Sequence, residues 1–484
     1  METLDPTDWE AMRSLAHRMV DDAIDYVATV RERPVWQPTP AEVAEWLQQP
    51  APHEPQGAEA AYADFVQNIL PYPMGNIHPR FWAWYMGNGT VLGALADFWA
   101  AIMNPNMGGG NHAAILVEQQ VIRWLQDVLH FPADAGGLLV SGGSMANLVG
   151  LAVARNVTAG YDVRADGVSA AQSPLVVYAS SEVHSCNQKA VELLGLGSKA
   201  LHKIPVMDDF RIDLRLLEQA IVDDRATGKL PICVIGSAGT VNTGAVDDLN
   251  ALADLCLRDK MWFHVDGAIG AVAMLAESVC GLLAGIERAD SVALDLHKWM
   301  HIPFEAGCVI VRDRAAHRSS FALTPEYLEP EVRGLAGTNF WYSDYGVQLS
   351  RQFRALKVWM SIKEHGLDRF GRMIDRNVAQ AHYLKRLVEA EPRLEIMAPV
   401  ELDIVCFRYC FASAPAGAQN ALNKEIVLRL QEQGIAAPSL TTLRGQTCIR
   451  VAIASHRSTD DDFVLLVNHV LSIGDELAKS APSR

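Results

Sequence analysis

Short apolar runs alternate with segments of helical spacing through the middle of the chain, from about residue 88 to 355. The strand candidates are Gly137–Val140, Leu175–Tyr178, Ile232–Ile235, Trp262–Val265, Ser291–Leu294 and Cys308–Val311. Each run is almost continuously apolar, which is typical of strands that are buried on both faces. The pattern predicts an α/β fold built on a large, mostly parallel sheet.

The first 87 residues are predicted to be helices broken by prolines. The apolar residues from Trp9 to Val30 have helical spacing. A second helix is predicted to start with Thr39 as its N-cap and Pro40 in its first position. Because this amphipathic segment has no apolar core of its own, we expect it to pack across an interface between two copies of the chain.

A smaller α+β region is predicted after the sheet. A helix from Ala355 to His365 leads into it, and strands are expected at Ile404–Arg408 and Thr447–Ala452. The chain is therefore expected to have three parts, which are an N-terminal helical segment (1–87), a large domain (88–355) and a small C-terminal domain (356–484).

Composition narrows the class of protein. The 484 residues are 50% hydrophobic and carry a formal net charge of −16, which disfavours nucleic acid as a partner. No apolar run is long enough to span a membrane, and the N-terminus lacks the basic flank and apolar core of a signal peptide. The 8 cysteines have no Cys-x-x-Cys spacing, which fits free thiols in a reducing compartment. We expect a cytoplasmic protein that acts on a small molecule.

Two polar residues at the ends of apolar runs carry the strongest chemical indication. Asp266 closes the run that starts at Trp262, and Lys298 follows the run Ser291–Leu294. Enzymes that use pyridoxal 5′-phosphate (PLP) need such a pair, because a lysine amine forms an imine with the cofactor aldehyde and a carboxylate pairs with the protonated pyridine nitrogen. The cationic ring then accepts electrons when a bond at the substrate α-carbon breaks. Either residue alone would be ambiguous, but together they predict PLP chemistry.

A glycine-rich segment, Ser141–Asn147, follows the first predicted strand and opens a helix. Glycines let the backbone approach an anion, and the exposed N–H groups of a helix N-terminus point at it. The same residues would also make an ordinary strand-to-helix turn. No further glycines follow with dinucleotide-fold spacing, so a PLP phosphate is a better occupant than a nicotinamide cofactor.

Two further residues lie at predicted carboxyl ends of strands, where open α/β sheets bind ligands. His184 follows the strand that starts at Leu175, and its imidazole could stack on the pyridine ring. Thr240 lies in the segment Gly239–Gly244, where its hydroxyl could meet the cofactor, although turn formation explains the glycines equally well.

Taken together, these motifs resemble those of the group II PLP-dependent decarboxylases, which include aromatic-L-amino-acid, glutamate, cysteine-sulfinate and diaminobutyrate decarboxylases. The resemblance runs collinearly from about His78 to Arg457. It rests on Ser141–Asn147, Ser181–Ser185, Gly239–Thr240, His264–Ala268, His297–Trp299 and Arg351–Lys357. It implies the type I fold of PLP-dependent transferases and a two-fold homodimer with active sites at the subunit interface.

The resemblance also implies roles for individual residues. Lys298 would form the imine, Asp266 would pair with the pyridine nitrogen, and His184 would stack on the ring. The other cofactor-binding positions would be Gly143, Ser144 and His297 near the phosphate, and Thr240 and Ala268 along the cofactor. Asp295 stands where animal members of the family have an asparagine near the phosphate. Because a second carboxylate would repel the phosphate unless it is paired or turned away, Asp295 is not assigned as a phosphate ligand.

The residues expected near the substrate give two opposing indications. Asn104 and Asn106 lie in a small, polar stretch that is more similar to the acidic-amino-acid branch of the family than to the aromatic branch. The cluster Phe81–Tyr85, which lies before it and includes Trp84 and Tyr85, could form an aromatic wall, although such clusters are more often plain core. The side chain of the substrate, aromatic or acidic and small polar, is left open.

A tyrosine on a mobile loop supplies a proton to the α-carbon in the aromatic decarboxylases of this family. The segment from Glu329 to Tyr345 has few packing signals and resembles such a loop. Counting back from Arg351, Tyr342 falls at the position of that tyrosine, and Tyr345 and Tyr327 are close competitors.

We therefore expect an amino acid decarboxylase that releases CO2 and a primary amine. The alternatives are aminotransfer or oxygen-dependent aldehyde formation on the same scaffold, and a non-catalytic protein of this fold. Aldehyde-forming relatives tend to carry phenylalanine at the loop tyrosine position, so Tyr342 argues against that branch. The intact set of Lys298, Asp266 and His184 argues against a non-catalytic protein.

Overall fold

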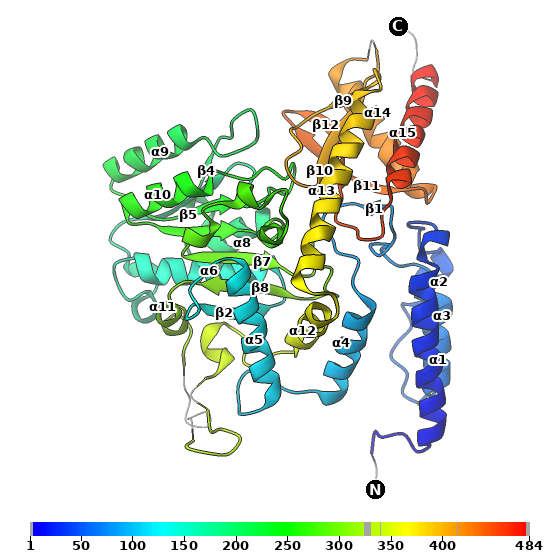
Figure 1. Cartoon of the computed structure of the whole chain (residues 1–484), viewed down its shortest axis with the longest axis horizontal. Helices are drawn as coiled ribbons and strands as arrows, with labels where there is room; N and C mark the ends of the chain where they lie inside the picture. The colour runs from blue at the N-terminus through cyan, green and yellow to red at the C-terminus, as the bar shows by residue number, and fades with distance from the viewer. Residues whose placement is uncertain (1–2, 324–330, 339, 413, 481–484) are drawn as a thin grey trace.

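A seven-stranded sheet forms the centre of the larger part of the molecule (Figure 1). The computed structural model describes residues 3–323, 331–338, 340–412 and 414–480. The strands lie in the order β2-β8-β7-β6-β5-β3-β4. Their bounds are β2 Gly136–Val140, β3 Leu175–Ser180, β4 Leu201–Ile204, β5 Leu230–Ser237, β6 Trp262–Asp266, β7 Ser291–Asp295 and β8 Gly307–Val311.

The predicted mostly parallel sheet is confirmed. All six strands predicted from the apolar runs are present, and β7, β6, β5, β3 and β4 are parallel to one another. Strand β8 is the exception, because it runs antiparallel to both of its neighbours, β2 and β7. The apolar runs did not predict β4, whose two middle residues, His202 and Lys203, are polar and incompletely buried.

Helices connect these strands and pack against the sheet. Their bounds are α5 Ala113–Val128, α6 Gly143–Thr158, α7 Val163–Asp166, α8 Ser185–Leu193, α9 Leu214–Ala226, α10 Leu249–Asp259 and α11 Arg314–Ser319. Asp213 and Asp248 fix the starts of α9 and α10, since each carboxylate accepts a hydrogen bond from a first-turn N–H group. Helix α6 differs, because Gly142 precedes it and no side chain caps its N-terminus.

A five-stranded sheet, in the order β1-β11-β12-β10-β9, forms the smaller part. Its elements are β1 Phe81–Trp82, β9 Leu394–Ile396, β10 Ile404–Tyr409, β11 Ala437–Leu443 and β12 Gln446–Ala452, with helices α12 Arg354–His365, α13 Leu367–Glu389, α14 Ala416–Glu432 and α15 Asp460–Ser480. The two-residue strand β1 pairs in parallel with β11. The N-terminal segment, predicted as helical only, therefore also contributes a strand to the C-terminal sheet.

The N-terminal helices lie to one side of the rest of the chain (Figure 1). They are α1 Trp9–Ala28, α2 Ala41–Trp46 and α3 Ala58–Asn68, and α4 Val91–Met103 follows and packs on α12. The predicted helix start at Thr39 is wrong by one residue, because α2 begins at Ala41 and Pro40 takes the N-cap position. No helix among the described residues is long and apolar enough to cross a membrane.

A buried ion pair fixes β2, the strand that leads into the glycine-rich segment. Arg351 donates hydrogen bonds through Nη1 to the Met107 carbonyl at 2.8 Å and to Glu118 Oε2 at 3.2 Å. Its Nη2 donates to Glu118 Oε1 and to the Leu139 carbonyl, and the Leu139 N–H donates to the same carboxylate. The Arg351 and Glu118 side chains are 1% and 0% exposed. The pair therefore joins β2, α5 and the segment before α12 in the core.

Replacing Arg351 with methionine is expected to lower the free energy of unfolding by about 3–5 kcal/mol, because Glu118 would be left buried without its cation. The double variant Arg351→Met/Glu118→Leu should recover a large part of this loss, since neither charge then remains. Chemical denaturation of the three proteins measures the effect. A single variant within about 0.5 kcal/mol of the wild type would contradict the structural role of the pair.

Candidate active site

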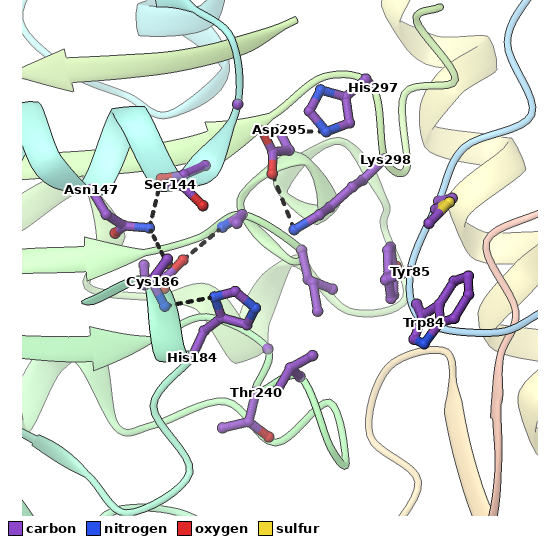
Figure 2. Close-up of a pocket in the computed structure, with 18 of the residues that line it drawn as sticks. Trp84, Tyr85, Ser144, Asn147, His184, Cys186, Thr240, Asp295, His297 and Lys298 are labelled. Carbon is purple, nitrogen blue, oxygen red and sulfur yellow. Dashed lines mark hydrogen bonds and ion pairs between the residues drawn. The ribbon is translucent and has the colours of Figure 1, made fainter. Parts of the chain in front are cut away.

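A cavity of about 640 Å³ lies where the carboxyl ends of the parallel strands meet elements of the smaller sheet. Ten of the residues expected at the site line it, which are Trp84, Tyr85, Gly143, Ser144, His184, Thr240, Asp266, Ala268, His297 and Lys298. Figure 2 shows the glycine-rich side of the cavity and the aromatic pair on opposite sides of Lys298. Segments far apart in the sequence thus converge on one lysine.

Lys298 lies in the turn after β7 and extends into the cavity (Figure 2). Its Nζ is 3.0 Å from Oδ2 of Asp295, the last residue of β7. The Asp295 side chain is 3% exposed, whereas the Lys298 side chain is 21% exposed. The only lysine that lines the cavity among the described residues is therefore paired with a carboxylate that the protein has buried.

Asp266 ends β6 on the floor of the cavity. Its Oδ2 accepts a hydrogen bond from Asn187 Nδ2 at 2.7 Å, and its Oδ1 accepts one from the Ala268 N–H at 3.3 Å. These two hydrogen bonds fix the direction of the carboxylate. A carboxylate held in this way can pair with a protonated ring nitrogen.

The glycine-rich segment lets the backbone approach the end of β7 closely. A Cβ atom on Gly143, the first residue of α6, would lie 2.7 Å from Asp295 Oδ2. A Cβ atom on Gly307 would lie 2.5 Å from the Cα atom of Gly142. A larger residue would displace the Asp295 side chain at Gly143 and the backbone of Gly142 at Gly307. The uncapped N-terminus of α6 can therefore receive an anion such as a phosphate.

A chain of buried hydrogen bonds supports this loop from below. Trp262 Nε1 donates to Ser291 Oγ at 2.8 Å, and Ser291 Oγ lies 2.8 Å from His264 Nδ1. His264 Nε2 lies 2.7 Å from Asn147 Oδ1, and Asn147 Nδ2 donates to the Gly143 carbonyl at 2.9 Å. Burial lowers the pKa of His264 to about 4, so the imidazole is neutral at physiological pH. The network links β6 and β7 to the first turn of α6.

His184 precedes α8, and its Nδ1 accepts a hydrogen bond from the Cys186 N–H at 3.2 Å. This bond fixes the ring at the cavity wall (Figure 2). Burial is the main cause that lowers the pKa of His184, so a neutral ring is available for stacking. The Thr240 hydroxyl, in contrast, contacts Thr243 Oγ1 at 3.0 Å and accepts from the Ala245 N–H, so it also holds its own turn.

His297 lies beside Lys298 with its ring against Phe304, at a centroid distance of 4.3 Å. Its Nδ1 accepts a hydrogen bond from the Ala306 N–H at 3.2 Å, so Nε2 carries the proton of the neutral ring. This Nε2 lies 3.7 Å from Asp295 Oδ1. Burial, more than any other cause, lowers the pKa of His297.

Aromatic and apolar side chains line part of the cavity. Trp84, Tyr85, Met86 and Phe304 contribute to this lining. The Tyr85 hydroxyl donates to Asp403 Oδ2 at 2.6 Å, so the ring is fixed and its polar end points away into the core. Burial raises the pKa of Asp403 to about 7. The predicted aromatic wall is therefore present at Trp84 and Tyr85, whereas Phe81 and Trp82 are buried core residues of β1.

Sequence reasoning missed several residues of the site, most notably Arg450. This residue of β12 is 3% exposed and lines the cavity. Its guanidinium donates to the carbonyl groups of Trp84 and Asn242, while Nη2 has no hydrogen-bond partner among the described residues. Glu182, also on the cavity wall, accepts from Asn242 Nδ2 at 2.8 Å. The local sequence around Arg450 has the ordinary apolar pattern of a strand. Its place in the cavity becomes visible only when the smaller sheet is packed against the larger one.

The interpretation of Tyr342 as an acid at this site is not supported by its position. Its side chain is 1% exposed, and the Arg351 guanidinium lies 4.8 Å from the ring centroid. Tyr342 and Tyr345 line a separate cavity of about 170 Å³ and do not line the lysine cavity. The Tyr345 hydroxyl accepts a hydrogen bond from Arg314 Nε at 3.2 Å. The third candidate, Tyr327, lies outside the described residues.

Asn104 and Asn106, which were predicted near the substrate, hold turns within this chain. Neither residue lines the lysine cavity, and both are exposed. Asn104 ends α4 in the left-handed conformation, with φ of 46°. Asn106 Oδ1 accepts from the N–H groups of Gly108 and Arg351, so it holds a turn.

The residues around the cavity fit the parts of PLP. An uncapped helix N-terminus suits the phosphate, the hydrogen-bonded Asp266 suits the ring nitrogen, and neutral His184 suits the ring face. Lys298 supplies the amine. Together with the mostly parallel sheet, this arrangement defines a PLP-dependent enzyme of fold type I.

Comparison with known proteins agrees with this class. The pyridoxal-dependent decarboxylase conserved domain matches residues 40–410. An aromatic-L-amino-acid decarboxylase of Bacillus atrophaeus is 34% identical over 478 residues, which cover 98% of this chain and 97% of that protein. A phenylacetaldehyde synthase of Arabidopsis thaliana is 29% identical over 472 residues and 94% of both chains. The crystal structure of Oryza sativa TDC with PLP and tryptamine is similar with a TM-score of 0.90 and 27% identity, and the match covers 98% of this chain and 100% of that one.

The chain therefore belongs to the pyridoxal-dependent decarboxylase family. It is a PLP-dependent carboxy-lyase that converts an L-amino acid to the corresponding primary amine and CO2.

Proposed function

We propose that the substrate is an aromatic L-amino acid. The observation that carries this proposal is the aromatic and apolar part of the cavity lining, formed by Trp84, Tyr85, Met86 and Phe304. Aromatic side chains bind flat rings through stacked and edge-on contacts, with a large apolar area buried. The relative from Bacillus atrophaeus, described as an aromatic-L-amino-acid decarboxylase, supports the same substrate class.

The charges around the cavity disfavour an acidic substrate side chain. Four carboxylates line it, which are Glu182, Asp266, Asp295 and Glu305. Lys298 and Arg450 are the only lysine and arginine that line it among the described residues. Lys298 is committed to the cofactor and pairs with Asp295, and Arg450 already donates to two backbone carbonyls, which leaves its Nη2 for the α-carboxylate that every amino acid substrate carries. A second carboxylate on the substrate would therefore meet mostly like charge.

The substrate class can be tested with a panel of L-amino acids while CO2 release is measured. We expect kcat/KM for tryptophan, tyrosine or dopa to exceed that for glutamate and diaminobutyrate by at least about 100-fold, which corresponds to about 2.7 kcal/mol. Trp84→Ala should lower kcat/KM for the preferred aromatic substrate about tenfold or more, because stacking area is lost.

Leu257→Ala is a suitable control for Trp84→Ala, since that leucine is 77% exposed on α10 and does not line the cavity. Faster release of CO2 from glutamate or diaminobutyrate than from every aromatic amino acid would exclude the proposed substrate class.

Within this proposal, the cofactor supplies an electron sink at the α-carbon, and the chain's own residues orient the reactants. Asp266 keeps the ring nitrogen protonated, His184 holds the ring plane and the N-terminus of α6 holds the phosphate. Arg450, whose Nη2 has no hydrogen-bond partner among the described residues, would attract the α-carboxylate of the substrate into the cavity. The proton donor to the α-carbon stays a prediction from the sequence, with Tyr342 at the family position and Tyr345 and Tyr327 as competitors. Within one chain, Tyr342 and Tyr345 line a separate cavity.

We also propose a homodimer formed through α1 and α4. A second cavity, of about 500 Å³, lies between these helices and is lined by apolar residues that include Met19, Ile24 and Phe98. Trp99, Ile102 and Met103 on α4 are 56%, 63% and 58% exposed. A continuous apolar surface of this kind is typical of an interface between subunits. Phe304 lines both cavities, so the interface would lie next to the active site.

Sedimentation at the protein concentration of the activity assay should give the mass of two chains. Phe98→Glu should shift the protein toward the monomer and lower activity, because it places a charge in the apolar surface. Leu193→Glu, at a residue that is 76% exposed on α8, should leave the dimer intact. A fully active monomer would refute the proposed assembly.

A cytoplasmic location also remains a proposal. All 8 cysteines are free thiols in the structure, and 6 of them are buried. Free thiols persist in a reducing compartment.

A further inference from the structure

The cofactor-binding roles described above do not account for the buried position of Asp295 beside Lys298. The Asp295 side chain is 3% exposed, and its Oδ2 lies 3.0 Å from Lys298 Nζ. Its Oδ1 is buried and has no hydrogen-bond partner among the described residues. A buried carboxylate with one unpartnered oxygen is costly, and the ammonium of Lys298 is the charge that offsets this cost.

The surroundings of Asp295 hold its carboxylate in place and present positive charge to it. Its Oδ2 lies against the first residue of α6, where only the absence of a Cβ on Gly143 leaves room for it. The N-terminus of this 16-residue helix carries partial positive charge, which stabilises a carboxylate. The proton of His297 Nε2 faces Oδ1 across 3.7 Å, which is too long for a hydrogen bond but adds to the positive potential.

We propose that Asp295 is the counter-ion that keeps the Lys298 nitrogen protonated, both as the free ammonium and in the imine with the cofactor. This inference rests on the role of Lys298 in the proposed function. With the cofactor bound, a proton held on the Lys298 nitrogen would favour the exchange of Lys298 for the incoming substrate amine. The ammonium that Lys298 becomes after its displacement also has a fixed partner. In this role Asp295 is a positioning residue that holds a proton at Nζ.

The other charged or titratable groups near Lys298 are less suited to this task. Asp266 already accepts two hydrogen bonds and makes no ion pair with Lys298 in the described structure. Glu305 pairs instead with Arg354 Nη2 at 2.7 Å and is 43% exposed. His184, Cys186 and His297 are the remaining titratable groups on which the Lys298 charge acts, and none of them is a carboxylate.

The pairing also explains why a carboxylate is tolerated beside a phosphate site. A free Asp295 carboxylate would repel the phosphate at the α6 N-terminus, but the ion pair with the Lys298 nitrogen carries no net charge. Protonation of that nitrogen and binding of the phosphate are therefore expected to favour each other in this chain.

The test is a spectroscopic titration of the PLP-loaded enzyme without substrate. The visible band of the protonated imine is measured against pH in the wild type, Asp295→Asn, Asp295→Glu and Glu305→Gln. We expect Asp295→Asn to lower the midpoint by about 1 to 3 pH units, because a negative charge next to the nitrogen is lost. Asp295→Glu keeps the negative charge, so its midpoint should stay close to that of the wild type. Glu305→Gln should change the midpoint by less than about 0.3 pH units, because Glu305 is paired elsewhere and partly exposed.

Two further readouts keep the outcome decisive. Asp295→Asn should retain full cofactor content and bind pyridoxine 5′-phosphate, which has the ring and phosphate but no aldehyde, at least as tightly as the wild type. An unchanged midpoint in Asp295→Asn, or an equal shift in Glu305→Gln, would overturn the inference. A shift of the midpoint that appears only together with weaker binding of pyridoxine 5′-phosphate would overturn the inference too. Asp295 would then support the geometry of the site and would not act on the Lys298 proton. A wild type with no imine band at all would instead overturn the proposed role of Lys298.

Discussion

Lys298→Ala is expected to lower turnover by at least about 10³-fold and to remove the visible absorption band of the PLP-loaded protein. Lys298 is the only lysine lining the cavity among the described residues, so no second amine can take its place there. The substitution also leaves Asp295 as a buried carboxylate without its partner at 3.0 Å. We therefore expect weaker binding of the cofactor phosphate as well, through repulsion at the α6 N-terminus.

Lys298→Arg is the matched control for these two effects. Arginine keeps a positive charge near Asp295 but forms no imine, so cofactor affinity should partly recover while turnover stays as low as in Lys298→Ala. Turnover is measured as CO2 release and affinity as the quenching of intrinsic fluorescence by PLP. An arginine or alanine variant with more than a few per cent of wild-type turnover would assign the chemistry to another amine.

Asp266→Asn is expected to leave cofactor binding almost intact and to lower kcat by about 10²- to 10³-fold. Asparagine has the same shape, and its amide oxygen can still accept the hydrogen bond that Asn187 Nδ2 donates at 2.7 Å. A neutral amide cannot hold the ring nitrogen in its protonated form, so the ring becomes a weak electron sink. The loss should fall on kcat rather than on KM, because substrate binding does not depend on this charge.

Asn187→Ala separates charge from orientation at the same place. It removes one hydrogen bond to Asp266 and leaves the carboxylate ionised, so its loss of kcat should be far smaller than that of Asp266→Asn. Both are measured in steady-state assays at saturating PLP. Near wild-type kcat in Asp266→Asn would exclude the ion pair with the ring nitrogen.

Much of the fold was predictable because the central strands are buried on both faces. Continuous apolar runs such as Trp262–Val265 and Ser291–Leu294 leave little choice but a covered sheet. The strands that escaped prediction are short or half exposed. Strand β1 has two residues, and its partner β11 lies more than 350 positions later, so no local pattern indicates the pairing.

The same reasoning explains which site residues the sequence revealed. Asp266 and Lys298 follow strands whose carboxyl ends meet at one edge of the sheet, so their convergence follows from the topology. Arg450 comes from the other sheet, and its approach depends on how the two sheets pack. The sequence predicted repulsion between Asp295 and the phosphate, but it did not predict the ion pair between Asp295 and Lys298. Residue spacing alone does not show that the lysine neutralises this carboxylate.

Tyr342 illustrates the limit of spacing as an argument. Its distance along the chain from Arg351 fits the position of the family's loop tyrosine, but spacing does not determine which way a side chain points. In the structure, Tyr342 packs against the Arg351 guanidinium in the core, because a large ring and a buried cation favour each other there. Asn104 and Asn106 likewise hold turns and do not line the lysine cavity of their own chain, since spacing does not tell which way a turn residue faces.

The central claim is that this cavity binds PLP through Lys298, and borohydride reduction of the loaded enzyme tests it most directly. Reduction fixes the imine as a stable secondary amine, and peptide mass analysis then locates the phosphopyridoxyl group. We predict one group per chain, on the peptide that contains Lys298, and its loss when an aromatic amino acid substrate is added before the reductant. A phosphopyridoxyl group on a different lysine, or a chain that takes up none, would contradict the account.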